Sequence, residues 1–136
     1  MRYLLDTNVW IEILKGKNLR VARKFASTPT EELATCSTVR AELVHGSEKY
    51  DDADSRKMDL AMTLSRAISL PFDDRCAERY GVIRHDLEQR MCVIGPFDLQ
   101  IAAVALVHDL TLVTGNMSEF KRVHGLRVED WSLPVD

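Results

Sequence analysis

The chain has 136 residues, 46% of them hydrophobic, and a net charge of −3. This length and composition predict a single domain over residues 1–136 with a core of its own. Its three cysteines, Cys36, Cys76 and Cys92, match neither a disulfide framework nor a zinc-binding pattern. Asp6 interrupts the apolar start of the chain before it reaches signal-peptide length, and the longest later apolar run, residues 101–107, is too short for a membrane span. These features predict a cytoplasmic protein without membrane contact.

Short apolar segments alternate with amphipathic ones along the chain. The apolar segments predict buried strands, and apolar residues spaced three or four apart predict helices. In chain order we expect a strand at 2–5, helices at 7–14 and 19–26, a strand at 33–36, helices at 39–47 and along the apolar stripe 60–68, a strand at 68–71, helices along the stripe 76–87 and at 97–108, and strands at 111–114 and 126–128. This alternation predicts an α/β fold, a three-layer α/β/α sandwich with a mainly parallel central sheet.

Asp6 directly follows the first predicted strand and precedes a helix. Taken alone it is best interpreted as a helix N-cap, with Thr7 and Asn8 in the first turn. Ligands in α/β proteins bind at the carboxyl ends of the strands, where Asp6 lies. The same carboxylate could therefore cap the helix through one oxygen and face a metal ion with the other.

Glu42 lies in the predicted helix at 39–47, for which Ser37 is a suitable N-cap. Helical spacing places Glu42 beside Val39 and Leu43, at the border of the apolar face. A charge in that position is costly unless it is paired or coordinates a cation.

Two further acids follow in the second half of the chain. Asp98 is at the start of a helix that is apolar nearly all round and therefore buried, and its ordinary role would be to cap the first turn. Glu119 follows the strand at 111–114 and alone would be an ordinary surface residue. Because parallel strands end at the same edge of a sheet, the fold should bring Glu119 towards Asp6.

Four carboxylates from distant segments, without a paired histidine or cysteine motif, form a set of hard oxygen ligands that suits Mg²⁺ or Mn²⁺. Such ions lower the pKa of a water molecule and neutralise charge on a phosphate, which favours phosphodiester hydrolysis. The net charge of −3 argues mildly against a nucleic-acid enzyme. Four acids committed to a metal site would account for that charge.

Four segments in order resemble the PIN-domain ribonucleases, and within them the VapC-type toxins of bacterial type II toxin–antitoxin pairs. They are LLDTNVWIEILKG, STVRAELVHGSEK, IGPFDLQIAAVAL and LVTGNMSEFKRVHGLRVEDW. Together they span nearly the whole chain, and their order and spacing are specific. The resemblance implies a single PIN domain with Asp6, Glu42, Asp98 and Glu119 as its catalytic, metal-binding acids and Mg²⁺, or Mn²⁺ as substitute, as its cofactor.

The same resemblance implies an activity and partners. The activity would be metal-dependent endonucleolytic cutting of RNA by a toxin that inhibits translation and growth. A VapB-type antitoxin would neutralise it, and DNA would be reached only through that antitoxin. A homodimer and a hetero-oligomer with the antitoxin are also implied.

Supporting roles follow by analogy with the family. Thr7 and Thr114 would line the metal pocket with hydroxyl groups, Asn8 would support the first carboxylate, and Asn116 would share the loop of the last acid. The chain departs from its relatives at Gly115, where a basic or polar residue is frequent, and at Met91 and Val93, where Gly and Pro are common. These departures affect loop shape and substrate contacts and leave the acids intact.

Three alternatives belong to other classes. A phospho-accepting receiver module would need an acidic pair after the first strand and a lysine after the last, and the chain has Asp6-Thr7-Asn8 and Glu129 there. A haloacid-type phosphatase would need a second aspartate two residues after Asp6. A non-catalytic PIN-like scaffold that binds RNA or protein would be favoured by a missing acid, whereas all four are present.

Other side chains carry weaker hypotheses. The scattered histidines do not predict a metal site. Trp10 is expected in the core or an interface, and Val9, Ile13 and Leu14 are expected to form an exposed apolar face for a partner helix. At most two of a set of arginines are expected to contact RNA phosphates, the candidates being Arg40, Arg75, Arg79, Arg84 and Arg90.

Overall fold

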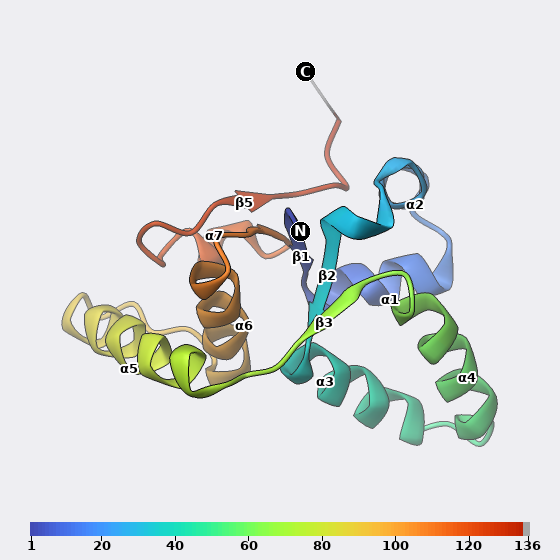
Figure 1. Ribbon diagram of the computed structural model, residues 1–136, viewed down its shortest axis with the longest axis horizontal. Coiled ribbons are helices and arrows are strands. Elements are labelled where there is room, and N and C mark those ends of the chain that lie inside the picture. Colours follow the sequence, from blue (N-terminus) through green and yellow to red (C-terminus); the bar gives the residue numbers. More distant parts are fainter. Residues whose placement is uncertain (135–136) are drawn as a thin grey trace.

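One parallel sheet of five strands forms the centre of the molecule in a computed structural model that describes residues 1–134 (Figure 1). The strands stand in the order β3-β2-β1-β4-β5, and all four pairings are parallel. The predicted α/β class with a mainly parallel sheet is thereby confirmed. The strands are β1 (Tyr3–Leu5), β2 (Leu33–Cys36), β3 (Ile68–Leu70), β4 (Thr111–Val113) and β5 (Val128–Glu129).

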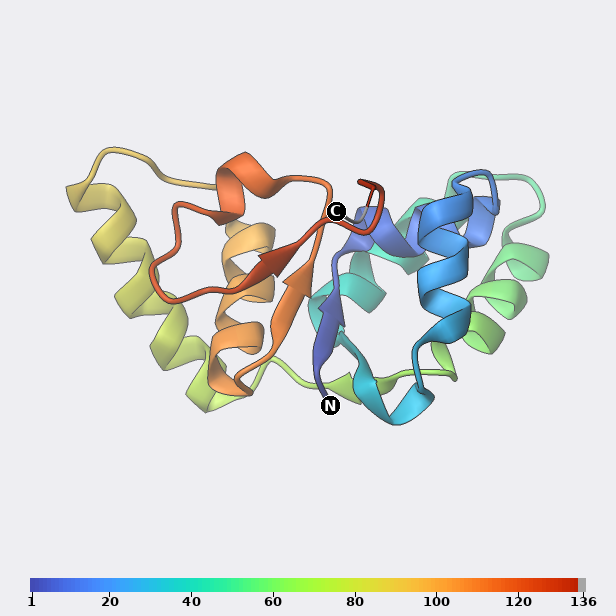
Figure 2. The ribbon, with the colours of Figure 1, turned by 90° about the horizontal axis from the view of Figure 1, so that it is seen from above.

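Helices flank the sheet and gather in two groups. Figures 1 and 2 both show α5 and α6 side by side near β4 and β5, with α1 to α4 at the other end of the molecule. The helices are α1 (Thr7–Lys15), α2 (Leu19–Ser27), α3 (Ser37–Glu48), α4 (Ala53–Leu64), α5 (Asp74–Gln89), α6 (Pro96–Val107) and α7 (Met117–Phe120), with a 3-10 turn at Thr30–Glu32.

The core is built around the central strands and α6. β1 is buried along its whole length, and residues 101–105 of α6 are fully buried, as the apolar sequence of this helix predicts. Trp10 is also fully buried and packs edge to face against Phe25, which confirms the prediction for that side chain. Burial of α6 fixes the helix that carries Asp98.

Three expected boundaries were wrong. The α3 helix begins at Ser37, and its N-cap is Cys36, whose backbone is extended (φ −141°, ψ 167°), so Ser37 is not the cap. The α4 helix ends at Leu64, because the chain turns and Ile68 enters β3 beside Ala34 instead of continuing the apolar stripe. The last strand lies at Val128–Glu129 rather than 126–128.

The expected apolar face of α1 was only partly correct. Val9 is buried in the core, whereas Ile13 is half-buried and Leu14 is exposed. Val9 follows the short loop out of β1 and therefore lies against the sheet. A partner can reach Leu14 but not Val9.

No helix among residues 1–134 combines the length and the apolar character that crossing a bilayer requires.

Candidate active site

The four predicted acids come from separate segments, and three follow strand ends of the sheet. Asp6 follows β1, Glu42 lies on α3 after β2, and Glu119 lies on α7 after β4. Asp98 lies in the first turn of α6. Because β1, β2 and β4 are parallel neighbours, their carboxyl ends lie at one edge of the sheet (Figure 2).

Asp6 is buried and held by two hydrogen bonds. The backbone N–H of Thr7 donates to Oδ1 at 2.8 Å, and the hydroxyl of Thr114 donates to Oδ2 at 2.9 Å. Burial raises the pKa of Asp6, Glu42 raises it further through charge repulsion, and the two hydrogen bonds partly counter this. Asp6 caps α1, as predicted, and also belongs to the group of acids.

Glu42 is tied to the first turn of α1. The Thr7 hydroxyl donates to its Oε1 at 2.8 Å, so one threonine serves Asp6 through its backbone and Glu42 through its side chain. A second link joins α3 to α6, because the Thr38 hydroxyl donates to Oε1 of Gln100 at 2.8 Å. These contacts fix α3 against both neighbouring helices.

Glu119 is oriented by the turn between β4 and α7. The side-chain amide of Asn116 donates to its Oε2 at 3.0 Å. The backbone N–H of Asn116 donates to the Thr114 hydroxyl at 2.9 Å, and that hydroxyl in turn donates to Asp6. One chain of hydrogen bonds therefore connects the turn that carries the last acid to the first acid.

Asp98 shows most directly that the acids share one environment. Burial, and after it the negative charges of Asp6, Glu119 and Glu42, together raise its pKa from 3.8 to about 6. All three charges that raise the pKa of Asp98 are those of carboxylates. A carboxylate surrounded in this way is ionised at neutral pH at a cost, which a cation would offset.

The donor set fits a hard divalent cation. Within residues 1–134, no three acids, histidines or cysteines lie close enough to enclose an ion by themselves. Mg²⁺ keeps several waters and takes one or two carboxylates directly, so it does not require such a cage. A donor set of carboxylates held by hydroxyl and amide groups suits Mg²⁺ or Mn²⁺.

The predicted supporting residues are distributed unevenly. Thr7, Thr114 and Asn116 hydrogen-bond to acids, whereas Asn8 is exposed on α1 and lines a small depression with Gly115. Gln100 was not identified from the sequence. Its position two residues after Asp98 was the only available signal.

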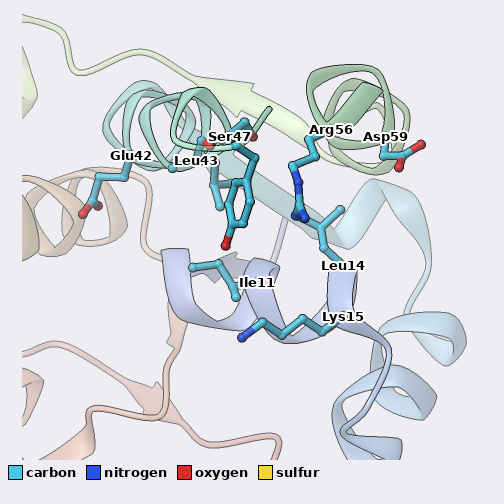
Figure 3. Close-up of a pocket in the computed structure, with 10 residues that line it drawn as sticks. Ile11, Leu14, Lys15, Glu42, Leu43, Ser47, Arg56 and Asp59 are labelled. Atoms are coloured by element: carbon cyan, nitrogen blue, oxygen red, sulfur yellow. Dashed lines mark hydrogen bonds between the residues drawn. The ribbon is translucent and has the colours of Figure 1, made fainter. Parts of the chain in front are cut away.

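A groove extends from Glu42 between α1, α3 and α4 and has a volume of about 470 Å³. Figure 3 shows Glu42 at one end and Arg56 with Asp59 at the other, with Ile11 and Leu14 on the floor. Glu42 therefore joins the group of acids to a groove with apolar side chains along its floor and charged side chains at its ends.

Comparison with known proteins gives consistent similarity over the whole chain. A family model described as "PIN domain" matches residues 3–126. The chain is 35% identical over 132 residues to the tRNA(fMet)-specific endonuclease VapC of Shigella flexneri, covering 97% of this chain and 99% of that relative. It is 35% identical over 137 aligned positions to ribonuclease VapC2 of Rickettsia felis, covering 96% and 98%.

Solved structures show the same similarity. The VapBC structure from Salmonella typhimurium bound to DNA contains a chain that superimposes with a TM-score of 0.90 at 31% identity, covering 96% of this chain and 98% of that one. VapBC2 from Rickettsia felis, bound to a DNA fragment from its promoter, gives a TM-score of 0.86 at 32% identity, covering 96% and 99%.

Proposed function

The chain belongs to the PIN-domain family, among the VapC ribonuclease toxins of VapBC toxin–antitoxin systems, and on that premise we propose that it cuts RNA phosphodiester bonds with a divalent cation held by its four acids. The observation that carries the proposal is the environment of Asp98. The pKa of Asp98 is raised to about 6 by burial and by the charges of Asp6, Glu119 and Glu42, which come from other segments of the chain. Ionised carboxylates gathered in this way repel one another, and a bound cation would offset that repulsion.

The acids divide the work in the proposed mechanism. Asp6, Asp98 and Glu42 would hold the principal cation, one or two of them directly and the rest through its waters, and Glu119 would complete a second or outer position. When bound, Mg²⁺ or Mn²⁺ supplies neutralisation of phosphate charge and a lowered pKa for water. Thr7 orients Asp6 and Glu42 through its hydrogen bonds, and Thr114 also orients Asp6. Asn116 orients Glu119. Asn8, which is exposed, is assigned only to the rim of the site.

The proposed substrate is a structured RNA. The relative from Shigella flexneri is named for a tRNA, so transfer RNA is the first substrate to test. Hydrolysis by water, rather than attack by the RNA 2′-oxygen, leaves 5′-phosphate and 3′-hydroxyl ends. Detection of 2′,3′-cyclic phosphate ends would exclude this route.

We also propose a VapB-type antitoxin as partner, in line with the VapBC complexes among the similar structures. The groove from Glu42 along Ile11 and Leu14 is where a segment of that partner would dock, since its floor is apolar and Arg56 and Asp59 lie at its end. DNA would be reached through the antitoxin. The proposal also includes a homodimer and a single domain over residues 1–136. The protein would act in the cytoplasm and inhibit translation and growth.

The test is cleavage of total bacterial RNA and of bulk tRNA by purified protein in Mg²⁺, Mn²⁺ or EDTA. We expect discrete fragments that require metal and disappear in Asp98→Asn. The matched control is Asp74→Asn, which removes an exposed first-turn acid from α5 and should cleave normally. Folded wild-type protein that cleaves nothing under either metal would favour the non-catalytic RNA- or protein-binding scaffold instead.

A further inference from the structure

We infer that residues 90–97, which comprise the loop between α5 and α6 and the first two residues of α6, form a contact surface for unpaired nucleotides of the RNA, with the ring of Phe97 stacking on a base. This inference rests on the proposed ribonuclease function and adds the part of the chain that reads the substrate next to the cut. Figure 2 shows this loop running along the same edge of the molecule as α7.

Residues 90–97 present three large apolar side chains to solvent. Met91 is 91% exposed, Phe97 56% and Val93 49%. Between them, Ile94 is buried and Cys92 packs against the core. Exposed and inward-facing side chains alternate over residues 91–94, so Met91 and Val93 point away from the core by the geometry of the segment. Clustered exposed apolar side chains within one short segment mark a binding surface.

Met91 has a strained backbone conformation. Its φ of 55° lies in the left-handed region, which a side chain such as methionine rarely adopts. A glycine would hold the same turn without strain. A strained, almost fully exposed apolar residue is consistent with a contact role for its side chain.

Two arginines hold the loop in place. Arg122 donates from Nη1 to the Val93 carbonyl at 3.3 Å, and Arg90 reaches both the carbonyl of Arg122 and, at 2.6 Å, the carboxylate of Asp86. Arg122 uses one of its five N–H donors in this contact, and Lys121 beside it is exposed. Arg122 thus places a positive group beside Val93 that is suited to a phosphate.

The loop also adjoins the acids directly. Phe97 immediately precedes Asp98, and a Cβ built on Gly95 would lie 4.0 Å from Oδ2 of Asp98. Arg122 follows Glu119 by three residues, and its N–H donates to the Glu119 carbonyl at 3.0 Å. Nucleotides that flank a phosphate held at the acids would pass over this surface.

The chemistry favours RNA over a protein as the occupant. Unpaired bases stack on aromatic rings while their phosphates need cations, and both groups are present here beside the proposed site of cleavage. The groove from Glu42 between α1, α3 and α4 lies on other elements and remains available for a protein partner.

The test measures binding without cleavage, in the Asp98→Asn background. The probes are a fluorescein-labelled RNA stem-loop with seven unpaired nucleotides and a fully paired duplex of similar length. Adding Phe97→Ala should weaken stem-loop binding on the order of 5- to 100-fold, the effect of losing one stacked base. Phe97→Trp should retain binding, and duplex binding should change little. Met62→Ala, which removes an exposed side chain from α4, is the matched control.

Two results would overturn the inference. One is stem-loop binding that Phe97→Ala leaves unchanged, and the other is an equal loss for stem-loop and duplex, which would rule out stacking on unpaired bases. Arg122→Gln provides an independent check, because loss of one phosphate contact should reduce the salt dependence of binding by about one ion. Failure of the nuclease proposal looks different: wild-type protein would cleave nothing while stem-loop binding still depended on Phe97.

Discussion

Replacing Asp98 with asparagine should stabilise the metal-free protein at neutral pH, although it should abolish activity. The pKa of Asp98 is raised to about 6 by burial and by three neighbouring carboxylates, against 3.8 in an unperturbed chain. The folded state therefore binds this proton more tightly than the unfolded state does. Stability is unaffected well below pH 4, falls as the pH rises from about 4 to about 6, and stays reduced above that.

The size of the effect follows from the shift. Roughly two pKa units correspond to about 3 kcal/mol, and Asp98 is only half-buried, so screening by solvent reduces this to about 1–2 kcal/mol. Asparagine also loses the attraction of a first-turn carboxylate to the helix dipole, which is worth about 0.3–1 kcal/mol. A net gain of about 1 kcal/mol in the free energy of unfolding remains at pH 7.5.

Urea unfolding at pH 4 and pH 7.5, in EDTA and in Mn²⁺, would measure it. Asp98→Asn should be more stable than wild type at pH 7.5 in EDTA, about equal at pH 4, and should gain less from Mn²⁺. The control is Asp74→Asn, which removes a first-turn acid outside the cluster and should be slightly destabilising at pH 7.5. If Asp98→Asn behaves like Asp74→Asn, the residue is a helix cap and the acidic cluster is not an energetic unit.

Two further substitutions test other parts of the structure. Thr114→Val removes the hydroxyl that donates to Asp6 and accepts from Asn116, so it should lower the free energy of unfolding in urea by about 1–3 kcal/mol and weaken cleavage. Thr114→Ser keeps the hydroxyl and should retain both stability and cleavage. Equal stability of the two variants would contradict this reasoning. Met91→Gly should relieve the strain of the left-handed backbone conformation and raise the thermal unfolding midpoint by up to about 3 °C. Met62→Gly, in the interior of α4, should lower that midpoint. A lower midpoint for Met91→Gly would show that the turn is not strained.

The sheet and the strand-end acids were predictable because their signals are local. A short apolar run followed by Asp6 or Thr114 specifies both a buried strand and a polar group at its end. The apolar sequence of α6 likewise predicted its burial. These features depend on neighbours within a few residues and on the known geometry of parallel sheets.

The errors occurred where tertiary contacts override a local pattern. The stripe through Leu64 continues to Ile68, but pairing of Ile68 with Ala34 in the sheet ends the helix earlier. Val9 appeared to face outward with Leu14, yet its position just after β1 buries it. In each case the deciding partner lies elsewhere in the chain.

The supporting contacts of the site were harder still to predict. That Thr7 donates to Glu42, and that Thr38 donates to Gln100, depends on how α1, α3 and α6 meet. Sequence spacing carries no information about distances of this kind. Arg122, which was not among the arginines considered for RNA contacts, joins the loop before Asp98 only in three dimensions.

The central position of β1 has a consequence for synthesis of the protein. β1 is made long before β4, which is one of its two neighbours in the sheet, and the hydroxyl that orients Asp6 belongs to Thr114. At about 5–20 residues per second, several seconds separate the two on the ribosome. A nascent or truncated chain that stops before β4 has neither the closed sheet nor Glu119. The group of four acids is thus assembled only after β4 and the turn to Glu119 have been made, more than 100 residues after β1.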